Sequence, residues 1–292
     1  MKILILGSTG MLGSSVLSEF SKKPNLDIVA TYRDERKKKI LFNIIQNKKV
    51  KFIKIDILKI IDFKLKKLIS NTDIIINCIG LINQKMIRSS DLDLAFKVNT
   101  LLPYKIFSLS SKKNKIYHIT TDGVFNGKKG NYKETDVHEC LELYSFTKSM
   151  GEVYDKNFYN IRCSILGKEL TSKKSLFSWF LNIKRGSTIK GYTNHIWNGV
   201  TANVLSKILL KIVEHKINIP NKFHLIPKDK VTKFTLLRFI KKSKKKSIKI
   251  IKYNTKLKLN RTLSTNYKRL NLKLWKITFG RQLTIKEMIN KI

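Results

Sequence analysis

The sequence predicts an α/β fold, with a Rossmann-type doubly wound parallel sheet and a smaller C-terminal substrate-binding lobe. Three observations indicate it: strands that are apolar throughout, helical segments between them, and a glycine-rich turn after the first strand. Strands that are apolar on both faces are typical of a parallel sheet covered by helices on both sides. A glycine-rich turn between a first strand and a first helix is typical of dinucleotide-binding sheets.

The expected strands are six apolar segments in the first half of the chain. They are residues 2–7, 27–32, 51–56, 73–80, 115–122 and 157–166. Residues 12–23 have apolar side chains at helical spacing and form the predicted first helix. After residue 166 the alternation loosens, and further helices are expected at 175–184, 201–214 and 284–291. We therefore predict a cofactor-binding domain over 1–166 and a substrate-binding lobe over 167–292, partly interleaved with it.

The composition is strongly basic, with 60 Lys and Arg against 20 Asp and Glu, a net charge of +40 over 292 residues. Such a charge is compatible with binding to nucleic acid or a membrane surface. However, Lys, Ile and Asn are abundant together, as AT-rich codons would make them, and the charge is spread along the whole chain. We therefore favour compositional drift and expect no specific nucleic-acid partner and no membrane partner. Anionic ligands would still be attracted by this field.

The sequence points to a cytoplasmic protein. No segment reaches the ~18 uninterrupted apolar residues of a membrane span. The N-terminal apolar run is short and is followed by glycines, so we interpret it as a strand and not as a targeting segment. Cys78, Cys140 and Cys163 are far apart and odd in number, which suggests neither a disulfide framework nor a metal site.

The stretch ILILGSTGMLG places three glycines at equal spacing directly after the first strand. Gly7 permits the tight turn, Gly10 lets a pyrophosphate approach the backbone, and Gly13 lets the helix pack close to the sheet. The helix N-terminus then offers free N–H groups to the phosphates. The alternative is a merely tight turn between strand and helix. The cofactor contacts expected from this loop are Gly7, Thr9, Gly10, Met11, Leu12 and Gly13.

The end of the second strand, ATYRDE, bears on the choice of dinucleotide. NAD-binding versions usually carry an acidic residue there, but this chain has Thr31 or Tyr32, followed at once by Arg33. A cation suits the 2′-phosphate of NADP, so we favour NADPH as the cofactor. Asp34 and Glu35 come slightly late, and they keep NADH open as the alternative.

Asp56 follows the third strand and, with its neighbour Ile57, is a further candidate for cofactor contact. The carboxylate of Asp56 could bond the adenine amino group. Alternatively, it could be the N-cap of the next helix.

Tyr144 and Lys148 stand four residues apart in the stretch YSFTK. On a helix this spacing places both side chains on one face. A phenol beside an ammonium can serve proton transfer, but the same spacing also arises by chance in a chain so rich in Lys. The meaning of the pair depends on the motifs around it.

Four further motifs accompany the glycine loop: NCIG (77–80), VNTLLP (98–103), TTDGVFNG (120–127) and YSFTKSMGE (144–152). Together they make the chain resemble the extended short-chain dehydrogenases/reductases. Within that superfamily it is most similar to the dTDP-4-dehydrorhamnose reductase family. The most similar segments are TTDGVFNGKKGNYKETD and NRTLSTNYKRL (260–270).

The resemblance implies roles that suit reduction of a ketone, whose oxygen becomes negative and needs a proton. Tyr144 would supply that proton. Lys148 would favour the phenolate and bond the nicotinamide ribose, and Thr121 would hold the carbonyl oxygen. Asn99 would join a proton relay or would merely kink its helix. The cofactor groove would be lined by Cys78, Ile79 and Gly80.

Two departures from the family pattern affect the substrate. Gly123 occupies the position at which the similar nucleotide-sugar dehydratases carry Glu. Its lack of an acidic side chain argues for a simple reductase. The reductase family often has Tyr at this position. The segment NRTLST lacks the family's proline but keeps Arg261 and Ser264. These two would either touch the substrate diphosphate or close the small lobe.

The stretch GYTNHIWNGVTA (191–202) mixes aromatic and amide side chains. Tyr192 or Trp197 could stack on a base or sugar, and Asn198 could bond a sugar hydroxyl. The alternatives are a core tryptophan and a turn asparagine. His118, His195 and His224 are scattered, so we expect them in the core or on the surface.

The expected function is NADPH-dependent reduction of the 4-keto group of a deoxy-sugar nucleotide. The resemblance favours the step from dTDP-4-dehydro-L-rhamnose to dTDP-L-rhamnose, for surface polysaccharide synthesis. The alternatives are a reductase or epimerase acting on another nucleotide-sugar, such as a UDP-linked one, a non-catalytic regulatory subunit of the same fold, and a polyanion-binding protein. The expected partner is the nucleotide-sugar substrate, and a homodimer is left open.

Overall fold

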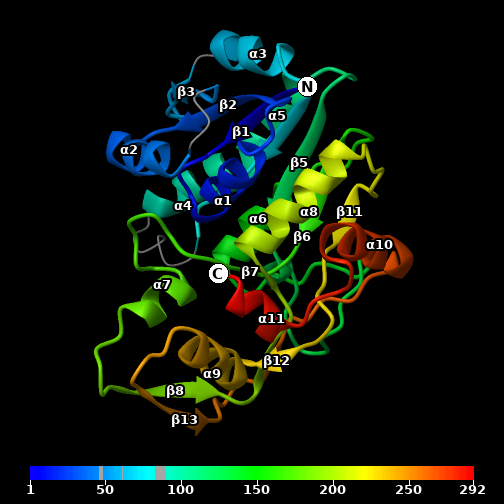
Figure 1. Ribbon diagram of the computed structural model, residues 1–292. Coiled ribbons are helices and arrows are strands. Elements are labelled where there is room, and N and C mark those ends of the chain that lie inside the picture. Colours follow the sequence, from blue (N-terminus) through cyan, green and yellow to red (C-terminus); the bar gives the residue numbers. More distant parts are fainter. Residues whose placement is uncertain (46–48, 61, 83–89) are drawn as a thin grey trace.

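The structure is a computed structural model and describes residues 1–45, 49–60, 62–82 and 90–292 (Figure 1). Within these residues the central element is a seven-stranded sheet in the order β11-β6-β5-β4-β1-β2-β3. Every neighbouring pair in it is parallel. Its strands are β1 (Lys2–Leu6), β2 (Asp27–Tyr32), β3 (Lys51–Lys54), β4 (Ile74–Asn77), β5 (Lys115–Thr120), β6 (Phe158–Arg162) and β11 (Lys222–His224).

The chain enters this sheet at the inner strand β1 and fills the two sides of it in turn. From β1 it moves outward to β2 and β3, returns to place β4 against the other side of β1, and then continues to β5, β6 and β11. Such a reversal of strand order opens a crevice at the carboxyl ends of the strands. The crevice here lies between the ends of β1 and β4. The predicted doubly wound fold is therefore confirmed.

Helices cover both faces of the sheet, and β1 shows how the sequence achieves it. Ile3 and Ile5 belong to a core formed with α1 (Met11–Phe20) and α8 (Ala202–Glu214). Leu4 and Leu6 belong to a second core formed with α3 (Asp62–Ser70) and α5 (Leu102–Ser108). Because successive side chains of a strand point to opposite faces, a fully apolar strand requires a helix on each side.

The remaining helices of the described residues lie around the sheet and in the smaller lobe (Figure 1). They are α2 (Glu35–Ile44), α4 (Ser90–Ala95), the π-helix η2 (Phe96–Leu101), the 3₁₀ turn η3 (Asp122–Val124), α6 (Leu143–Met150), α7 (Leu176–Leu181), α9 (Lys233–Ser243), α10 (Lys268–Phe279) and α11 (Ile285–Asn290). In the described ranges, no helix combines the length and apolarity that crossing a lipid bilayer requires.

The smaller lobe contains three short sheets, and part of it lies below the central sheet in Figure 1. The strands are β7 (Ile165–Leu166) with β10 (Val200–Thr201), β8 (Thr188–Tyr192) with β13 (Lys249–Tyr253), and β9 (His195–Trp197) between β12 (Val231–Thr232) and β14 (Leu259–Asn260). Two elements that follow residue 166, α8 and β11, pack with the central sheet. The division at residue 166 stays a prediction.

The sixth predicted strand, 157–166, differs from the structure. It is broken into β6 and β7, with Cys163 and Ser164 between them. At the break the chain changes partners, because the Ser164 carbonyl accepts a hydrogen bond from the Val200 N–H at 2.8 Å and β7 then pairs with β10. The apolar pattern continues through the break, and therefore it could not reveal the change.

A buried ion pair joins β6 to the turn that follows α6. Arg162 on β6 donates to Glu152 through Nε at 2.8 Å and through Nη2 at 2.5 Å. Its Nη1 lies 3.2 Å from Nε2 of His224, whose backbone N–H donates to Glu134 at 3.0 Å. His224 is thus a core histidine. Removal of one partner from such a buried ion pair strongly destabilises a protein, so Arg162 and Glu152 fix the end of α6 against β6.

Candidate active site

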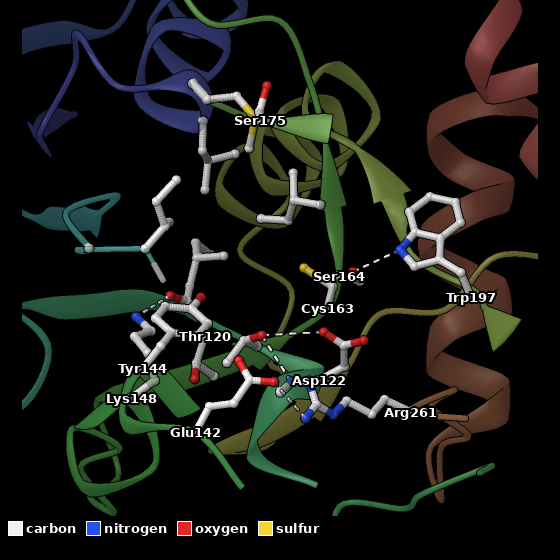
Figure 2. Close-up of a pocket in the computed structure, with 18 of the residues that line it drawn as sticks. Thr120, Asp122, Glu142, Tyr144, Lys148, Cys163, Ser164, Ser175, Trp197 and Arg261 are labelled. Atoms are coloured by element: carbon white, nitrogen blue, oxygen red, sulfur yellow. Dashed lines mark hydrogen bonds and ion pairs between the residues drawn. The ribbon is translucent and has the colours of Figure 1, made fainter. Parts of the chain in front are cut away.

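A cavity of about 450 Å³ lies where the carboxyl ends of β1, β4 and β5 face the smaller lobe (Figure 2). Tyr144 and Lys148 lie at one side of it and Trp197 at the other, with Asp122 and Cys163 between them. The structure brings these sequence-predicted residues together in its lining: Gly10, Met11, Leu12, Cys78, Ile79, Gly80, Thr121, Tyr144, Lys148, Trp197 and Arg261. The predicted residues outside this lining are Gly7, Thr9, Gly13, Arg33, Asp56, Ile57, Asn99 and Asn198.

The glycine loop forms one wall of the cavity. Gly7 has φ +77°, a backbone conformation that favours glycine, and its N–H donates to Oγ1 of Thr31 at 3.0 Å. A Cβ atom at Gly13 would lie 2.8 Å from the carbonyl carbon of Gly7 and nearer still to its oxygen. The helix α1 therefore packs so closely against the loop that a side chain at Gly13 would not fit.

The N-terminus of α1 is free to bind an anion. Gly10 is its N-cap and supplies no side-chain cap, and no acidic residue lies in the first turn. The first N–H groups of the helix and the positive end of its dipole therefore face the crevice without a competing carboxylate. Together with the space left by the glycines, this arrangement fits the pyrophosphate of a dinucleotide.

The end of β2 shows what its charged residues do. Asp34 is the N-cap of α2 and accepts from the Arg36 N–H at 2.9 Å, and these contacts hold the pKa of its carboxyl below the usual value despite some desolvation. Glu35 accepts a hydrogen bond from the Tyr32 hydroxyl at 2.9 Å. Both acidic residues thus have local partners, whereas Arg33 is exposed. Arg33 is therefore an accessible cation directly next to the strand end, while Asp34 and Glu35 are engaged in local hydrogen bonds.

Asp56 and Ile57 lie in a turn after β3. Asp56 accepts from the Leu58 N–H at 3.2 Å, and α3 does not begin until Asp62. Asp56 therefore caps a turn and is not the N-cap of that helix. Ile57 is half-buried against the core on the α3 side of the sheet. Their contact with adenine stays a prediction.

Tyr144 and Lys148 share one face of α6, as their spacing predicts. Burial raises the pKa of the Tyr144 phenol to about 12, although Thr121 acts in the opposite direction through a hydrogen bond. Burial lowers the pKa of the Lys148 ammonium to about 8. Nζ of Lys148 donates to the carbonyl of Ile119 at 3.0 Å. The site therefore holds a protonated phenol next to an amine whose charge changes close to neutral pH.

Thr121 directly follows β5, caps the turn η3 and forms a hydrogen bond with Tyr144. Its Oγ1 accepts from the Gly123 N–H at 3.0 Å and donates to Asp122 at 3.2 Å. Burial raises the pKa of Asp122, while Lys233 and Arg261 act against this rise. A Cβ atom at Gly123 would lie 2.9 Å from Oγ of Ser145. The hydroxyl of Thr121 is thus held in place by the turn that follows it.

Asn99 lies in the π-helix η2, behind the cavity. Its Oδ1 accepts from the Leu81 N–H at 2.8 Å, and its Nδ2 donates to the Leu81 carbonyl at 3.0 Å and to Thr147 at 3.1 Å. Asn99 thereby ties the segment after β4 to α6. π-helical turns occur frequently at functional sites. The structural role of Asn99 is visible, and its part in a proton relay stays a prediction.

The far side of the cavity belongs to the smaller lobe. Trp197 is buried and donates through Nε1 to Ser164 at 2.8 Å. Arg261 pairs with Glu142 at 3.2 Å. Asn198 holds the backbone of Leu263 at both ends of its amide, at 2.7 and 2.9 Å, and sugar contact by Asn198 stays a prediction.

Several lining residues were missed by the sequence-based prediction. Lys233, at the start of α9, places its ammonium 5.6 Å from the centre of the Trp197 ring. Burial lowers the pKa of Lys233, while Asp122 acts to raise it. Asp122 could have been found, because it stands inside the motif TTDGVF. Lys233 could not, because nothing distinguishes it among the other lysines. The missed residues include Asp122, Glu142, Ser164, His195 and Lys233.

In the described part of the chain, no three His, Cys, Asp or Glu side chains gather as metal ligands would. The site instead combines a glycine loop at a helix N-terminus, a Thr at a strand end, and a Tyr and a Lys one helical turn apart. On a doubly wound sheet, this set of features defines an extended short-chain dehydrogenase/reductase.

Comparison with protein families identifies the particular branch. The model described as "RmlD substrate binding domain" matches residues 1–291, and the chain belongs to this family. Comparison with curated protein sequences gives no match.

Solved structures agree in fold. A dTDP-4-dehydrorhamnose reductase from Clostridium acetobutylicum is 20% identical, with a TM-score of 0.73 over 100% of this chain and 98% of that one. A dTDP-4-dehydrorhamnose reductase from Bacillus anthracis, in complex with NADP, is 16% identical with a TM-score of 0.74 over 99% and 97%. A UDP-glucuronic acid 4-epimerase from Bacillus cereus, in complex with UDP-glucuronic acid and NAD, is 19% identical with a TM-score of 0.78 over 99% and 96%.

Proposed function

We propose that the protein is an NADPH-dependent reductase of the 4-keto group of a deoxy-sugar nucleotide. The single observation that carries the proposal is the convergence of Thr121, Tyr144 and Lys148 on the cavity that the glycine loop also borders. The favoured substrate is dTDP-4-dehydro-L-rhamnose, in agreement with the names of the reductases of similar fold. The product, dTDP-L-rhamnose, would serve surface polysaccharide synthesis.

The chain's own residues would act as follows. Bound NADPH would supply the hydride. Thr121 would turn its hydroxyl from Asp122 toward the substrate oxygen, and Tyr144 would donate the proton that this oxygen requires. Lys148 in its charged form would stabilise the phenolate left on Tyr144. Gly123 carries no acidic side chain, so the rest of the sugar ring would remain unchanged.

The anionic part of the substrate would lie on the other side of the cavity. Arg261 and Lys233 are the cations of that region, and Trp197 is placed to stack against a ring. Glu142 now pairs with Arg261, so substrate phosphates would compete with this carboxylate. In this assignment Arg261 remains a substrate-binding residue, as predicted from the sequence, and Lys233 is a second one.

The proposal is tested by NADPH oxidation with a panel of dTDP- and UDP-linked 4-keto sugar nucleotides. Oxidation of NADPH with the dTDP-linked 4-keto-6-deoxy sugar is the expected result. An epimerase would interconvert sugar nucleotides without net consumption of the cofactor. Binding of NADPH with no turnover on any sugar of the panel would contradict the reductase and favour a regulatory subunit.

The cofactor preference should depend on Arg33. Arg33→Ala removes the exposed cation next to the end of β2, so NADPH affinity should fall about tenfold or more, the scale of one charge-assisted hydrogen bond. NADH affinity should change little. Titration of both cofactors by fluorescence measures the ratio, with the exposed and distant Arg185→Ala as the control. Equal losses for the two cofactors would remove Arg33 from 2′-phosphate recognition.

The pH dependence should follow Lys148 and not Tyr144. The pKa of Tyr144 is about 12, so the phenol stays protonated through the neutral range. The pKa of Lys148 is about 8, so its stabilising charge is present below that pH and is lost above it. We expect the reduction rate to decline as pH rises through about 8. A rate that stays constant up to the pKa of Tyr144 would contradict this assignment.

A further inference from the structure

A chain of buried side chains connects Lys148 with the backbone beside the cofactor crevice. Oδ1 of Asn77, at the end of β4, accepts a hydrogen bond from the Ile79 N–H at 3.1 Å. Nδ2 of Asn77 lies 3.1 Å from Nδ1 of His118, and Nε2 of His118 lies 3.4 Å from Nζ of Lys148. Asn77 and His118 are fully buried, and Lys148 is 3% exposed. Each member must therefore find its hydrogen-bond partner inside the protein.

The donors of this chain determine the tautomer of His118. The Ile79 N–H can only donate, so it fixes the oxygen of the Asn77 amide on its own side. The amide NH₂ then faces His118 and also donates, so Nδ1 of His118 must accept. Burial and Lys148 hold the pKa of His118 well below its usual value, so the ring is neutral. We therefore assign its single proton to Nε2, where it points at Nζ of Lys148.

A proton on Nε2 favours one charge state of Lys148. An ammonium has three donors and no acceptor, whereas a neutral amine has a lone pair that can accept from Nε2–H. When Lys148 is neutral, every hydrogen bond can form in the chain that runs from the Ile79 N–H through Asn77 and His118 to Lys148. When Lys148 is charged, the ring proton must move to Nδ1, the Asn77 amide must turn, and the Ile79 N–H loses its acceptor.

Among the other described groups around Lys148, the anion that opposes this effect is Glu152, which acts to raise the pKa of Lys148. Its charge is compensated by the double hydrogen bond that it forms with Arg162. The Cys78 thiol, whose pKa burial raises to about 12, stays protonated. The same holds for Cys163, whose pKa is also raised by burial, and for the phenol of Tyr144 on the same helix. Asn99 on η2 uses its amide for Leu81 and Thr147, and Ile119 on β5 presents a neutral carbonyl.

We propose that His118 and Asn77 are positioning residues that favour the neutral amine of Lys148, so that the charge on Lys148 is coupled to the backbone N–H of Ile79. The proposal rests on the proposed function only in giving Lys148 a part in the reaction. Its consequence is that protonation of Lys148 frees a hydrogen-bond donor of Ile79 beside the cofactor crevice.

The first test is direct observation of the ring nitrogens of His118. ¹⁵N NMR of the full-length, histidine-labelled protein without cofactor, recorded about one pH unit above the pKa of Lys148, should show Nε2 protonated and Nδ1 not protonated. On acidification through that pKa the proton should move to Nδ1. The signals are assigned by their absence in His118→Gln. A proton on Nδ1 at the higher pH, or no change on acidification, would overturn the proposal.

The second test measures the charge of Lys148 itself. Lys148 is modified with a small amine-reactive compound over a series of pH values, and the modification rate is followed by peptide mass spectrometry. The pH dependence of that rate gives the apparent pKa of Lys148. His118→Phe removes the Nε2 donor and should raise this pKa by about one unit. His118→Gln, which keeps an N–H donor in a neutral side chain, should leave it near the wild-type value. Exposed lysines in the same digest provide the reference rates.

A matched control is His138→Phe, because His138 contacts the same helix through Ser149 at 2.6 Å and does not bond Lys148. It should leave the pKa of Lys148 unchanged. An unchanged pKa in His118→Phe, or an equal rise in the control, would contradict the proposal. If His118→Phe does not fold, His118→Gln and the wild-type NMR data still decide. Neither measurement needs substrate or cofactor. A failed reduction assay would therefore contradict the proposed function without affecting the test of this proposal.

Discussion

Tyr144→Phe should reduce the rate of sugar-nucleotide reduction at least ~100-fold, the usual scale for loss of a general acid. The substitution removes the hydroxyl that Thr121 holds and leaves the ring that fills the wall of the cavity. NADPH affinity should therefore stay close to the wild-type value. The comparison requires kcat from NADPH oxidation and the cofactor dissociation constant for the same preparation.

A suitable control is Tyr104→Phe, which removes a phenol hydroxyl at an exposed position. It should not change the rate. A nearly normal rate in Tyr144→Phe would contradict the role of Tyr144 as the proton donor. A loss of both turnover and cofactor binding would instead indicate a collapsed cavity.

Gly13→Ala should destabilise the protein by about 2–3 kcal/mol, the upper range for a side chain forced into a packed region. The added methyl group would lie 2.9 Å from Cα of Ser8 and would overlap the backbone of Gly7. Relief requires α1 to move away from the loop. Chemical denaturation would measure the change in free energy of unfolding, and NADPH titration would show the accompanying loss of affinity.

Gly10→Ala separates the effect on binding from the effect on packing. A Cβ atom at Gly10 would lie 3.3 Å from the oxygen of Gly7, and Gly10 has φ −77°, which any residue adopts. We therefore expect Gly10→Ala to fold with nearly normal stability but to bind NADPH less tightly, because its methyl group faces the crevice. A Gly13→Ala protein as stable as Gly10→Ala would contradict the close packing of α1.

The local features of the fold could be predicted from the sequence because each depends on residues close together in the chain. The glycine loop, the apolar strands and the Tyr–Lys spacing are of this kind. The break at Cys163 and Ser164 could not be predicted, because it depends on pairing with Val200 far along the chain. The short strand β11 has three residues and no apolar periodicity that would reveal it.

The side of the candidate site that contains the glycine loop, Tyr144 and Lys148 could be predicted much more fully than the side formed by the smaller lobe. Thr121, Tyr144 and Lys148 stand in motifs with fixed spacing. Lys233 reaches the cavity through long-range packing and is not marked by its neighbours, whereas Glu142 stands directly before the helix that carries Tyr144. Asn198 shows the opposite case, because the amide that suggested a sugar contact holds the backbone of Leu263 in the structure.

The break between β6 and β7 has a further consequence for how this protein could acquire new substrates. Ser164 binds the Val200 backbone with its carbonyl and the Trp197 indole with its hydroxyl, so one residue connects the side of the cavity that carries Trp197 to β6. A substitution at this joint would shift the indole relative to Tyr144 without altering any group that performs chemistry. If the proposed roles hold, substrate choice could evolve at this joint independently of Thr121, Tyr144 and Lys148.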